Sequence, residues 1–247
     1  MRADLDRHYQ DALADADGRG VRATVDKLEV NLRSSDAVIA MRPSVLLSVT
    51  KDAAYRSYHR ALDQDLRQIA EEALHRHRGV VDMAVHTGYF ADITNAAIST
   101  DGRALNNYGA ISVTIGERFI ADRATVLREN AWDFYERHDL GARGAEEEPG
   151  WRCVWADRAK LGVTHLAPNV TGATSNDALH HLVLEPGTGR HDDHFMEVHI
   201  FDMLTADTFA AVSLDRPLTD SEQQKDWDMA SQKLAARGIP VKGGTHP

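Results

Sequence analysis

Side chains that could do chemistry are concentrated between His194 and Phe201, where alternating residue types predict a β-strand. The face of this strand expected in the core comprises Met196, Val198 and Ile200. The opposite face comprises Phe195, Glu197, His199 and Phe201. A carboxylate held among aromatic rings is costly to ionise, which favours a functional role for Glu197. The alternative is an edge strand on which Glu197 points into water.

A histidine and two hydroxyl groups hold comparable positions on two other expected strands. His86 ends a strand expected at residues 80–86, and Ser112 and Thr114 lie on the polar face of one expected at 110–116. If these strands neighbour the strand of Glu197, the side chains converge on one cleft suited to a ligand with sugar hydroxyls. Taken singly, each residue has a structural explanation, such as a surface histidine or the β propensity of Ser and Thr.

A second candidate is a divalent-metal site around residues 191–199. Its possible ligands are His191, Asp192, Asp193 and His194, with His180, His181 and His199 nearby in the sequence. Such groups bind zinc or manganese and could serve a metal-dependent hydrolase. However, the segment follows a Gly- and Pro-containing stretch typical of a solvated loop, and its spacing matches no known metal motif. We therefore assign no metal ligands and keep the hydrolase as an alternative.

Composition restricts the class of protein. The chain has 247 residues, 43% of them hydrophobic and 27% charged, which is sufficient for a globular core. A formal charge of -10 argues against nucleic acid as a partner. No apolar stretch is long enough for a membrane span, and no phosphate-binding glycine loop or nucleophile elbow occurs. With one cysteine, Cys153, and a charged N-terminus unlike a signal peptide, the sequence predicts a cytoplasmic protein.

The expected elements are helical first and rich in strands afterwards. Helices are expected at 2–17, 51–78, 89–98, 130–137 and 157–166, and after a capping box at Thr219 and Glu222. Strands are expected at 80–86, 110–116, 180–184, 194–201 and 208–214, while 21–50 is ambiguous. The pattern predicts an α+β protein with a helical N-terminal region, 1–79. The following domain, 80–247, is expected to hold a mixed, mainly antiparallel sheet with flanking helices.

Four short motifs follow one another in the middle of the chain. They are His86-Thr87-Gly88, Ser99-Thr100-Asp101-Gly102-Arg103, Asn107-Tyr108-Gly109-Ala110-Ile111-Ser112-Val113 and Arg123-Ala124-Thr125. Together they resemble the ADP-ribosyltransferase domains of bacterial toxins and phage head-associated proteins. Those domains end with a glutamate-bearing strand, a short loop and another strand, which correspond here to residues 195–200, 204–207 and 209–212. The resemblance covers roughly residues 80–214.

The resemblance implies an NAD-dependent mono-ADP-ribosyltransferase that releases nicotinamide. It implies that Glu197 contacts the nicotinamide ribose and stabilises positive charge as the glycosidic bond breaks. It also implies that His86 holds the adenosine-side ribose and that Tyr108 or Tyr89 stacks on nicotinamide. The expected NAD site comprises His86, Thr87, Tyr89, Tyr108, Ser112 and Thr114, beside the expected catalytic residues Glu197 and His199.

The chain departs from the family pattern at Phe195, because many members carry Glu or Gln two residues before the catalytic glutamate. If Glu197 matches that earlier position instead, His199 replaces the catalytic glutamate and the domain is a degenerate NAD-binding relative. A further alternative is a non-catalytic structural protein, for example a phage-associated one, that binds a protein partner through its N-terminal helices.

Overall fold

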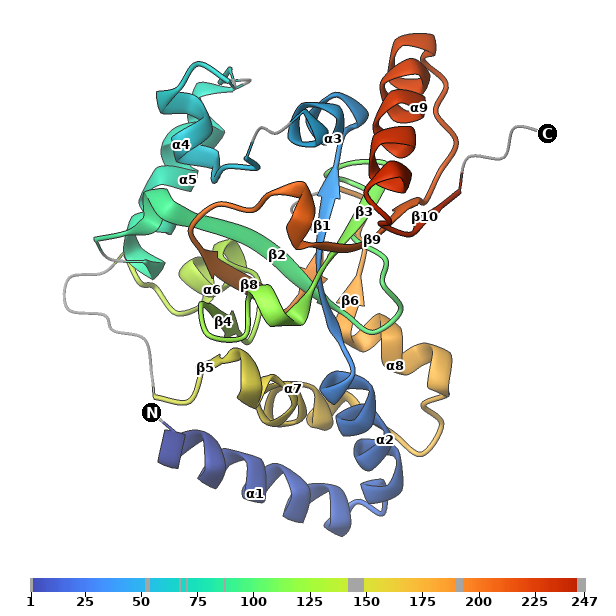
Figure 1. Cartoon of the computed structure of the whole chain (residues 1–247). Coiled ribbons are helices and arrows are strands. Elements are labelled where there is room, and N and C mark those ends of the chain that lie inside the picture. Colours follow the sequence, from blue (N-terminus) through green and yellow to red (C-terminus); the bar gives the residue numbers. More distant parts are fainter. Residues whose placement is uncertain are drawn as a thin grey trace.

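The protein folds into one large mixed sheet with helices on both faces, as the computed structural model in Figure 1 shows. The structure describes residues 2–51, 54–66, 68–69, 71–86, 88–141, 149–189 and 193–243. Its α-helices are α1 (Arg2–Gly18), α2 (Arg22–Arg33), α3 (Pro43–Thr50), α4 (Tyr58–Asp63), α5 (Glu72–Val85), α6 (Ala131–Arg137), α7 (Arg158–Leu166), α8 (Asn176–Val183) and α9 (Ser221–Ala236). Its strands are β1 (Asp36–Met41), β2 (Ile93–Ser99), β3 (Ile111–Ile115), β4 (Ala124–Leu127), β5 (Arg152–Val154), β6 (Leu184–Glu185), β7 (His194–Phe195), β8 (Glu197–Phe201), β9 (Phe209–Leu214) and β10 (Val241–Lys242).

The order of strands in the large sheet is β10-β9-β3-β1-β2-β8-β4-β5, and β6 and β7 form a separate pair. All neighbours in the large sheet are antiparallel except β10 and β9, which are parallel. This confirms the expected α+β class with a mixed, mainly antiparallel sheet. The expected boundary at residues 79 and 80 falls inside α5, however, and β1 lies at the centre of the sheet. The first 79 residues are therefore not a purely helical region.

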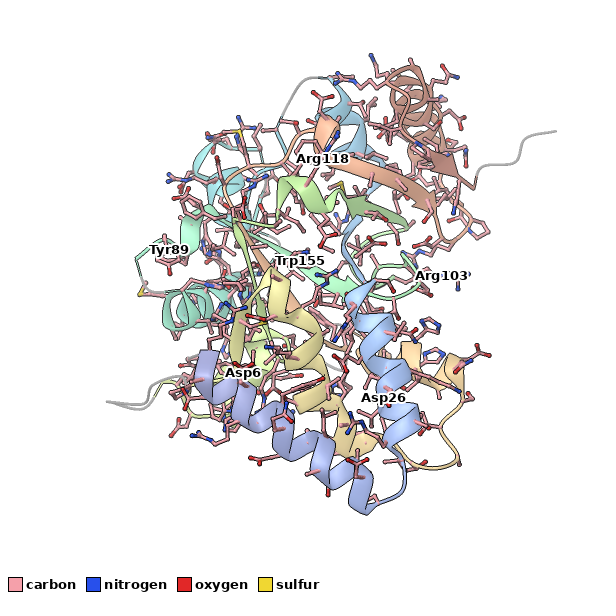
Figure 2. The ribbon with its side chains drawn as sticks, turned by 60° about the horizontal axis from the view of Figure 1, so that its bottom comes forward. Asp6, Asp26, Tyr89, Arg103, Arg118 and Trp155 are labelled. Carbon is pink, nitrogen blue, oxygen red and sulfur yellow. The ribbon has the colours of Figure 1, made fainter. Side chains whose placement is uncertain are left out.

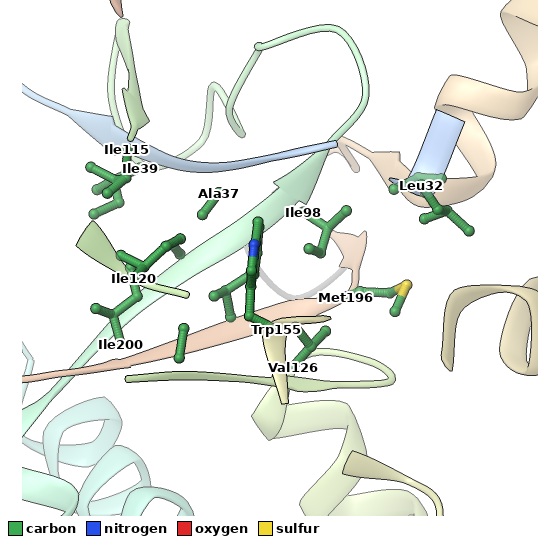
Figure 3. Close-up of a cluster of buried hydrophobic side chains, with 14 of the residues drawn as sticks. Leu32, Ala37, Ile39, Ile98, Ile115, Ile120, Val126, Trp155, Met196 and Ile200 are labelled. Atoms are coloured by element: carbon green, nitrogen blue, oxygen red, sulfur yellow. The ribbon is translucent and has the colours of Figure 1, made fainter. Parts of the chain in front are cut away.

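One face of the sheet is apolar and carries the main core (Figure 3). Its strand residues include Ile39, Ile98, Val113, Val126 and Ile200, all at most 4% exposed. Helices α1, α2, α3, α7 and α9 contribute to the same cluster, with Trp227 of α9 and the indole of Trp155 fully buried. Burial of this many large side chains supplies most of the free energy that favours folding.

The opposite face of the sheet is mixed, and it positions the candidate site. Leu127 of β4 packs there against Val81 and Val85 of α5 and against α6. The antiparallel register places Glu197 level with Leu127 and His199 level with Thr125, so these side chains share this face. A carboxylate and an imidazole thus lie in the layer between the sheet and α5.

The strand expected at residues 80–86 is wrong, because these residues form the last turns of α5 and the residue that follows it. The alternation of apolar residues suggested a period of two. In the structure, Val81 and Val85 are four residues apart on one helix face and are buried against Leu127, whereas Val80 and Met83 are 51% and 55% exposed. A four-residue step satisfies both periods over so short a run, so tertiary contacts decide.

Three further expectations are wrong. The single helix expected at 51–78 is interrupted, because α4 ends at Asp63, α5 begins at Glu72, and Tyr55 pairs with Leu204 in a β-bridge. Residues 89–98, expected as a helix, contain η1 (Phe90–Asp92) and then most of β2, which lies in the middle of the sheet. Residues 180–184, expected as a strand, belong mainly to α8, whose N-cap Ser175 accepts a hydrogen bond from Ala178 N at 3.2 Å. In α8 the buried residues Leu179 and Val183 are four residues apart, as a helix packed on one side requires.

Several other elements agree with the sequence. The expected helices at 2–17, 130–137 and 157–166 correspond to α1, α6 and α7, and the strands at 110–116, 194–201 and 208–214 to β3, β7 with β8, and β9. The final helix is also confirmed, but its N-cap is Asp220 rather than Thr219. Asp220 accepts hydrogen bonds from Glu222 N and Gln223 N. Among the described helices, none is long and apolar enough to cross a membrane.

Gly109 is required by a close approach of two backbones. A Cβ at this position would fall 2.8 Å from Met41 N and closer still to the Met41 carbonyl, so the end of β1 would have to move.

We expect Gly109→Ala to lower the free energy of unfolding by about 3 kcal/mol, as overpacking does. The control is Gly79→Ala in α5, where a Cβ meets nothing within 4 Å. That change should raise stability by about 0.5 kcal/mol through helix propensity. Urea unfolding would detect both, and equal effects would contradict the explanation.

Candidate functional site

A pocket of about 430 Å³ opens on the mixed face of the sheet, beside the C-terminal end of α5. The described residues that line it are Val85, His86, Tyr89, Ile93, Arg123, Thr125, Arg152, His199 and Phe201. They come from α5 and the segment after it, and from β2, β4, β5 and β8 with their flanking residues. Strands brought together only by the fold therefore form one concave site.

Two histidines meet in this pocket. The ring of His86, at the C-cap of α5, lies edge-on to the ring of His199 with centroids 4.0 Å apart. Burial lowers the pKa of His86 to about 2, helped by His199 and Arg152, and burial places the pKa of His199 well below its usual range. Both rings are therefore neutral near pH 7.

Arg152 fixes the orientation of His199. Its Nη1 lies 2.7 Å from Nδ1 of His199, and its Nη2 donates to the Val85 carbonyl at 3.2 Å. Because a guanidinium can only donate, Nδ1 of His199 accepts and the neutral ring carries its proton on Nε2. That Nε2 is buried without a hydrogen-bond partner, as is Nε2 of His86.

Glu197 lies behind His199 and does not itself line the pocket. Its Oε2 is 3.8 Å from Nε2 of His199 and accepts a hydrogen bond from Ala131 N, at the first residue of α6, at 2.5 Å. The residue is 5% exposed. Burial raises the pKa of the Glu197 carboxyl to about 7, and the charge of Asp82 adds to the rise. Glu197 can therefore change its charge near neutral pH, which is unusual for a glutamate.

Asp82 belongs to the same buried layer, on the facing side of α5. Its Oδ2 is 2.8 Å from Nε2 of His59, on α4, and 3.2 Å from Nε of Arg78. Burial acts to raise the pKa of Asp82, but the bond to His59 and the charge of Arg78 outweigh it and hold that pKa below its ordinary value. Asp82 is therefore an ionised carboxylate in the buried layer between α5 and the sheet.

The pocket also holds a second arginine and two aromatic rings. The guanidinium of Arg123 donates to the carbonyls of Phe119, Phe201 and Met203 at 2.6, 2.7 and 3.2 Å, which fixes its position. The rings of Tyr89 and Phe201 meet edge to face at 6.3 Å. Both are about half exposed, and Tyr89 lies at the outer edge of the molecule in Figure 2. The pocket thus combines positive charge with rings that a planar ligand can contact.

The structure brings together only part of the expected site. His86, His199 and Glu197 are adjacent, and Tyr89 lines the same pocket. Tyr108 is not among the lining residues, and Thr87 lies outside the described residues.

Ser112 and Thr114 do not reach the pocket. They lie on the same face of the sheet, but β1 and β2 separate β3 from β8, a distance of roughly 14 Å. Ser112 instead donates to Asp215 and accepts from Ala104 N at 2.6 Å, so it ties a loop to the sheet. A hydroxyl does line the pocket, but it is that of Thr125.

The expected metal cluster is only partly described, because His191 and Asp192 lie outside the described residues. Asp193 is fully buried and accepts from Asn107 Nδ2 at 2.8 Å and from Gly187 N at 2.9 Å. Nδ1 of His180 is 2.7 Å from the hydroxyl of Thr100. Across the described ranges, no three His, Cys, Asp or Glu side chains form a group that could hold a metal ion.

Sequence reasoning assigned no site role to five ionisable residues around the two histidines, His59, Arg78, Asp82, Arg123 and Arg152, although Arg123 belongs to one of the four motifs. For the residues on or next to α5, the sequence does contain a recognisable pattern. Arg78, Asp82 and His86 are spaced by four residues, which is a polar stripe once α5 is known to extend to Val85. Arg123 precedes β4 and Arg152 begins β5, and no hydrophobic pattern around either residue distinguishes it from a surface arginine.

The fold and the pocket define an α+β protein with a pocket lined by arginine and aromatic side chains. Comparison of the sequence with protein-family models gives no match, and comparison with curated proteins gives none either. The resemblance to ADP-ribosyltransferases therefore remains a prediction carried by the four short motifs.

Proposed function

We propose that this pocket binds NAD or a related nucleotide, and that the protein transfers ADP-ribose from NAD to an acceptor. The observation that carries the proposal is that two arginines, two aromatic rings and two neutral histidines line one pocket, directly over Glu197. Guanidinium groups bind phosphate oxygens, and aromatic side chains contact flat rings such as adenine and nicotinamide. The volume of about 430 Å³ lies within the range of small-molecule sites.

The charge of the pocket supports an anionic ligand. The whole chain has a formal charge of -10, yet none of the described residues that line the pocket is acidic. The hydrogen bonds of Arg123 go to three carbonyl oxygens, which orient its guanidinium without cancelling its charge. A locally positive pocket on an acidic protein favours phosphate groups over cationic ligands.

In the proposed reaction, the bond between ribose C1′ and the nicotinamide nitrogen breaks, and its electron pair leaves with neutral nicotinamide. An acceptor O–H or N–H adds to C1′ and gives up its proton to solvent. Positive charge develops on the ribose before the acceptor adds. His199 is the group that contacts the ribose, and the ionised carboxylate of Glu197 stabilises the charge through the imidazole between them.

The test is release of nicotinamide from NAD, measured by chromatography, together with NAD binding by calorimetry. We expect saturable release by the wild-type protein, with a rate that rises as pH increases through about 7, where Glu197 ionises. Glu197→Gln should slow release about 100-fold, in the range known for lost electrostatic stabilisation. NAD affinity should change little, because Glu197 does not line the pocket.

Glu136→Gln is the matched control, since Glu136 is exposed on α6 and bonds Trp132. It should leave the rate unchanged. Binding without release would leave an NAD-binding protein that lacks transfer activity. Absence of both binding and release would overturn the proposal.

A further inference from the structure

The layer between α5 and β8 contains ionisable side chains where helix-on-sheet packing is normally apolar. Arg78, Asp82 and His86 follow one another at four-residue steps on or next to α5. Helix α5 packs on the face of the sheet that carries Glu197 and His199, whose side chains are 7% and 1% exposed, and the ring of His86 contacts that of His199. Burying such groups costs stability unless they are paired, so the layer calls for a functional reason.

Asp82 is the fixed charge in this layer. Its carboxylate is held from two sides, by Arg78 one helical turn earlier and by His59 of α4. Helix α4 is itself anchored, because Arg60 forms two hydrogen bonds to Asp92 at 2.7 and 3.1 Å and the ring of His59 packs edge-on against Phe90 at 4.9 Å. The position of Asp82 is therefore determined by three elements of the fold.

Glu197 has no comparable cationic partner among the described residues. Its hydrogen bond comes from the Ala131 backbone, and Arg152 on β5 is engaged by His199 and the Val85 carbonyl. The remaining groups that face it are the neutral rings of His86 and His199. A second negative charge in this layer is thus opposed by Asp82 and balanced only by the more distant Arg78.

We propose that Asp82 is a positioning residue for Glu197: its fixed negative charge adds to the effect of burial and favours the protonated carboxyl until the cationic nicotinamide ring of NAD enters the pocket. This rests on the proposed function, because the nicotinamide ring and the ribose cation of NAD are the charges that would complete the layer. A cation in the pocket would favour release of the proton of Glu197. Below a pH of about 7, the carboxylate would therefore form mainly when a substrate is there to be stabilised.

The experiment follows the protonated carboxyl of Glu197 by its infrared C=O band, identified by its loss in Glu197→Gln. In the wild-type protein the band should titrate with a midpoint near 7. Asp82→Asn should lower that midpoint by about one pH unit, and Arg78→Met should raise it, since the two variants remove opposite charges. The pH profile of nicotinamide release should move in the same two directions.

Asp63→Asn is the control, because Asp63 lies on α4, like His59, but is exposed. Asp82→Glu should restore the wild-type midpoint. If Asp82→Asn does not fold, Arg78→Met still decides, because the Arg78 side chain is 34% exposed. Midpoints that stay at the wild-type value in the folded variants would overturn the inference. A wild-type protein that releases no nicotinamide would overturn the proposed function, while the infrared titration would still judge the role of Asp82.

Discussion

Replacing Glu197 by glutamine is expected to make the free energy of unfolding much less sensitive to pH between about 4.5 and 7. The pKa of this carboxyl rises from 4.5 to about 7 on folding, chiefly through burial. A raised pKa means that the folded state holds the proton more tightly. The stabilisation is therefore complete below the unfolded pKa and is lost as pH rises through the folded pKa. A difference of about 2.5 pH units corresponds to about 3 kcal/mol at 25 °C.

The measurement is urea unfolding of both proteins at half-unit steps from pH 4.5 to pH 8.5. The glutamine variant should gain about 3 kcal/mol relative to the wild-type protein across this range. His86 and His199 have lowered pKa values and make both proteins less stable towards acid, so their contribution cancels in the difference. The amide oxygen of the glutamine can still accept the Ala131 N–H. A difference that stays constant with pH would show that Glu197 does not titrate in this range.

Substituting Arg152 by methionine is expected to lower both stability and ligand affinity. The loss leaves Nδ1 of His199 and the Val85 carbonyl without the donor that now reaches them, at a cost of about 2 to 4 kcal/mol. It also removes one of the two positive charges that line the pocket, so NAD binding should weaken about 30-fold. In addition, a positive neighbour of the two buried histidines disappears, which should raise their pKa values.

Thermal unfolding and calorimetric titration with NAD would measure the two effects separately. Arg103→Met is the matched control, since Arg103 is exposed, lies on the opposite side of the molecule from Tyr89 in Figure 2, and its guanidinium pairs with Asp101 at 4.0 Å. It should change neither quantity. Lower stability with unchanged affinity would assign Arg152 a structural role alone and would point to Arg123 as the anion-binding group.

The strand that carries the site could be predicted because its pattern is complete. Met196, Val198 and Ile200 enter the main core, which forces Glu197 and His199 to the other face, and this is independent of the neighbouring strands. The lateral position of Ser112 could not be predicted in the same way. Its face was correctly assigned, but its distance from β8 depends on the strand order, which arises from long-range pairing.

The helical part of the site was obscured by a local ambiguity. Val81 and Val85 fit a strand and a helix equally well, and only the contact with Leu127 selects the helix. Once this helix is assigned, Arg78 and Asp82 lie two turns and one turn before His86 on one side of it. Arg152 belongs to a three-residue edge strand whose partner, β4, lies about 25 residues earlier, so the sequence carried no signal of its role.

The central place of β1 has a consequence for how the chain matures on the ribosome. This strand leaves the exit tunnel before its partners β2 and β3, which lie some 55 to 75 residues later, and their outer neighbours β8 and β9 follow roughly 160 to 170 residues after β1. Most of the sheet therefore cannot close until this long intervening stretch has been translated. Such late closure leaves an unpaired apolar ribbon exposed during synthesis, a state in which chaperone contact is the main protection against aggregation.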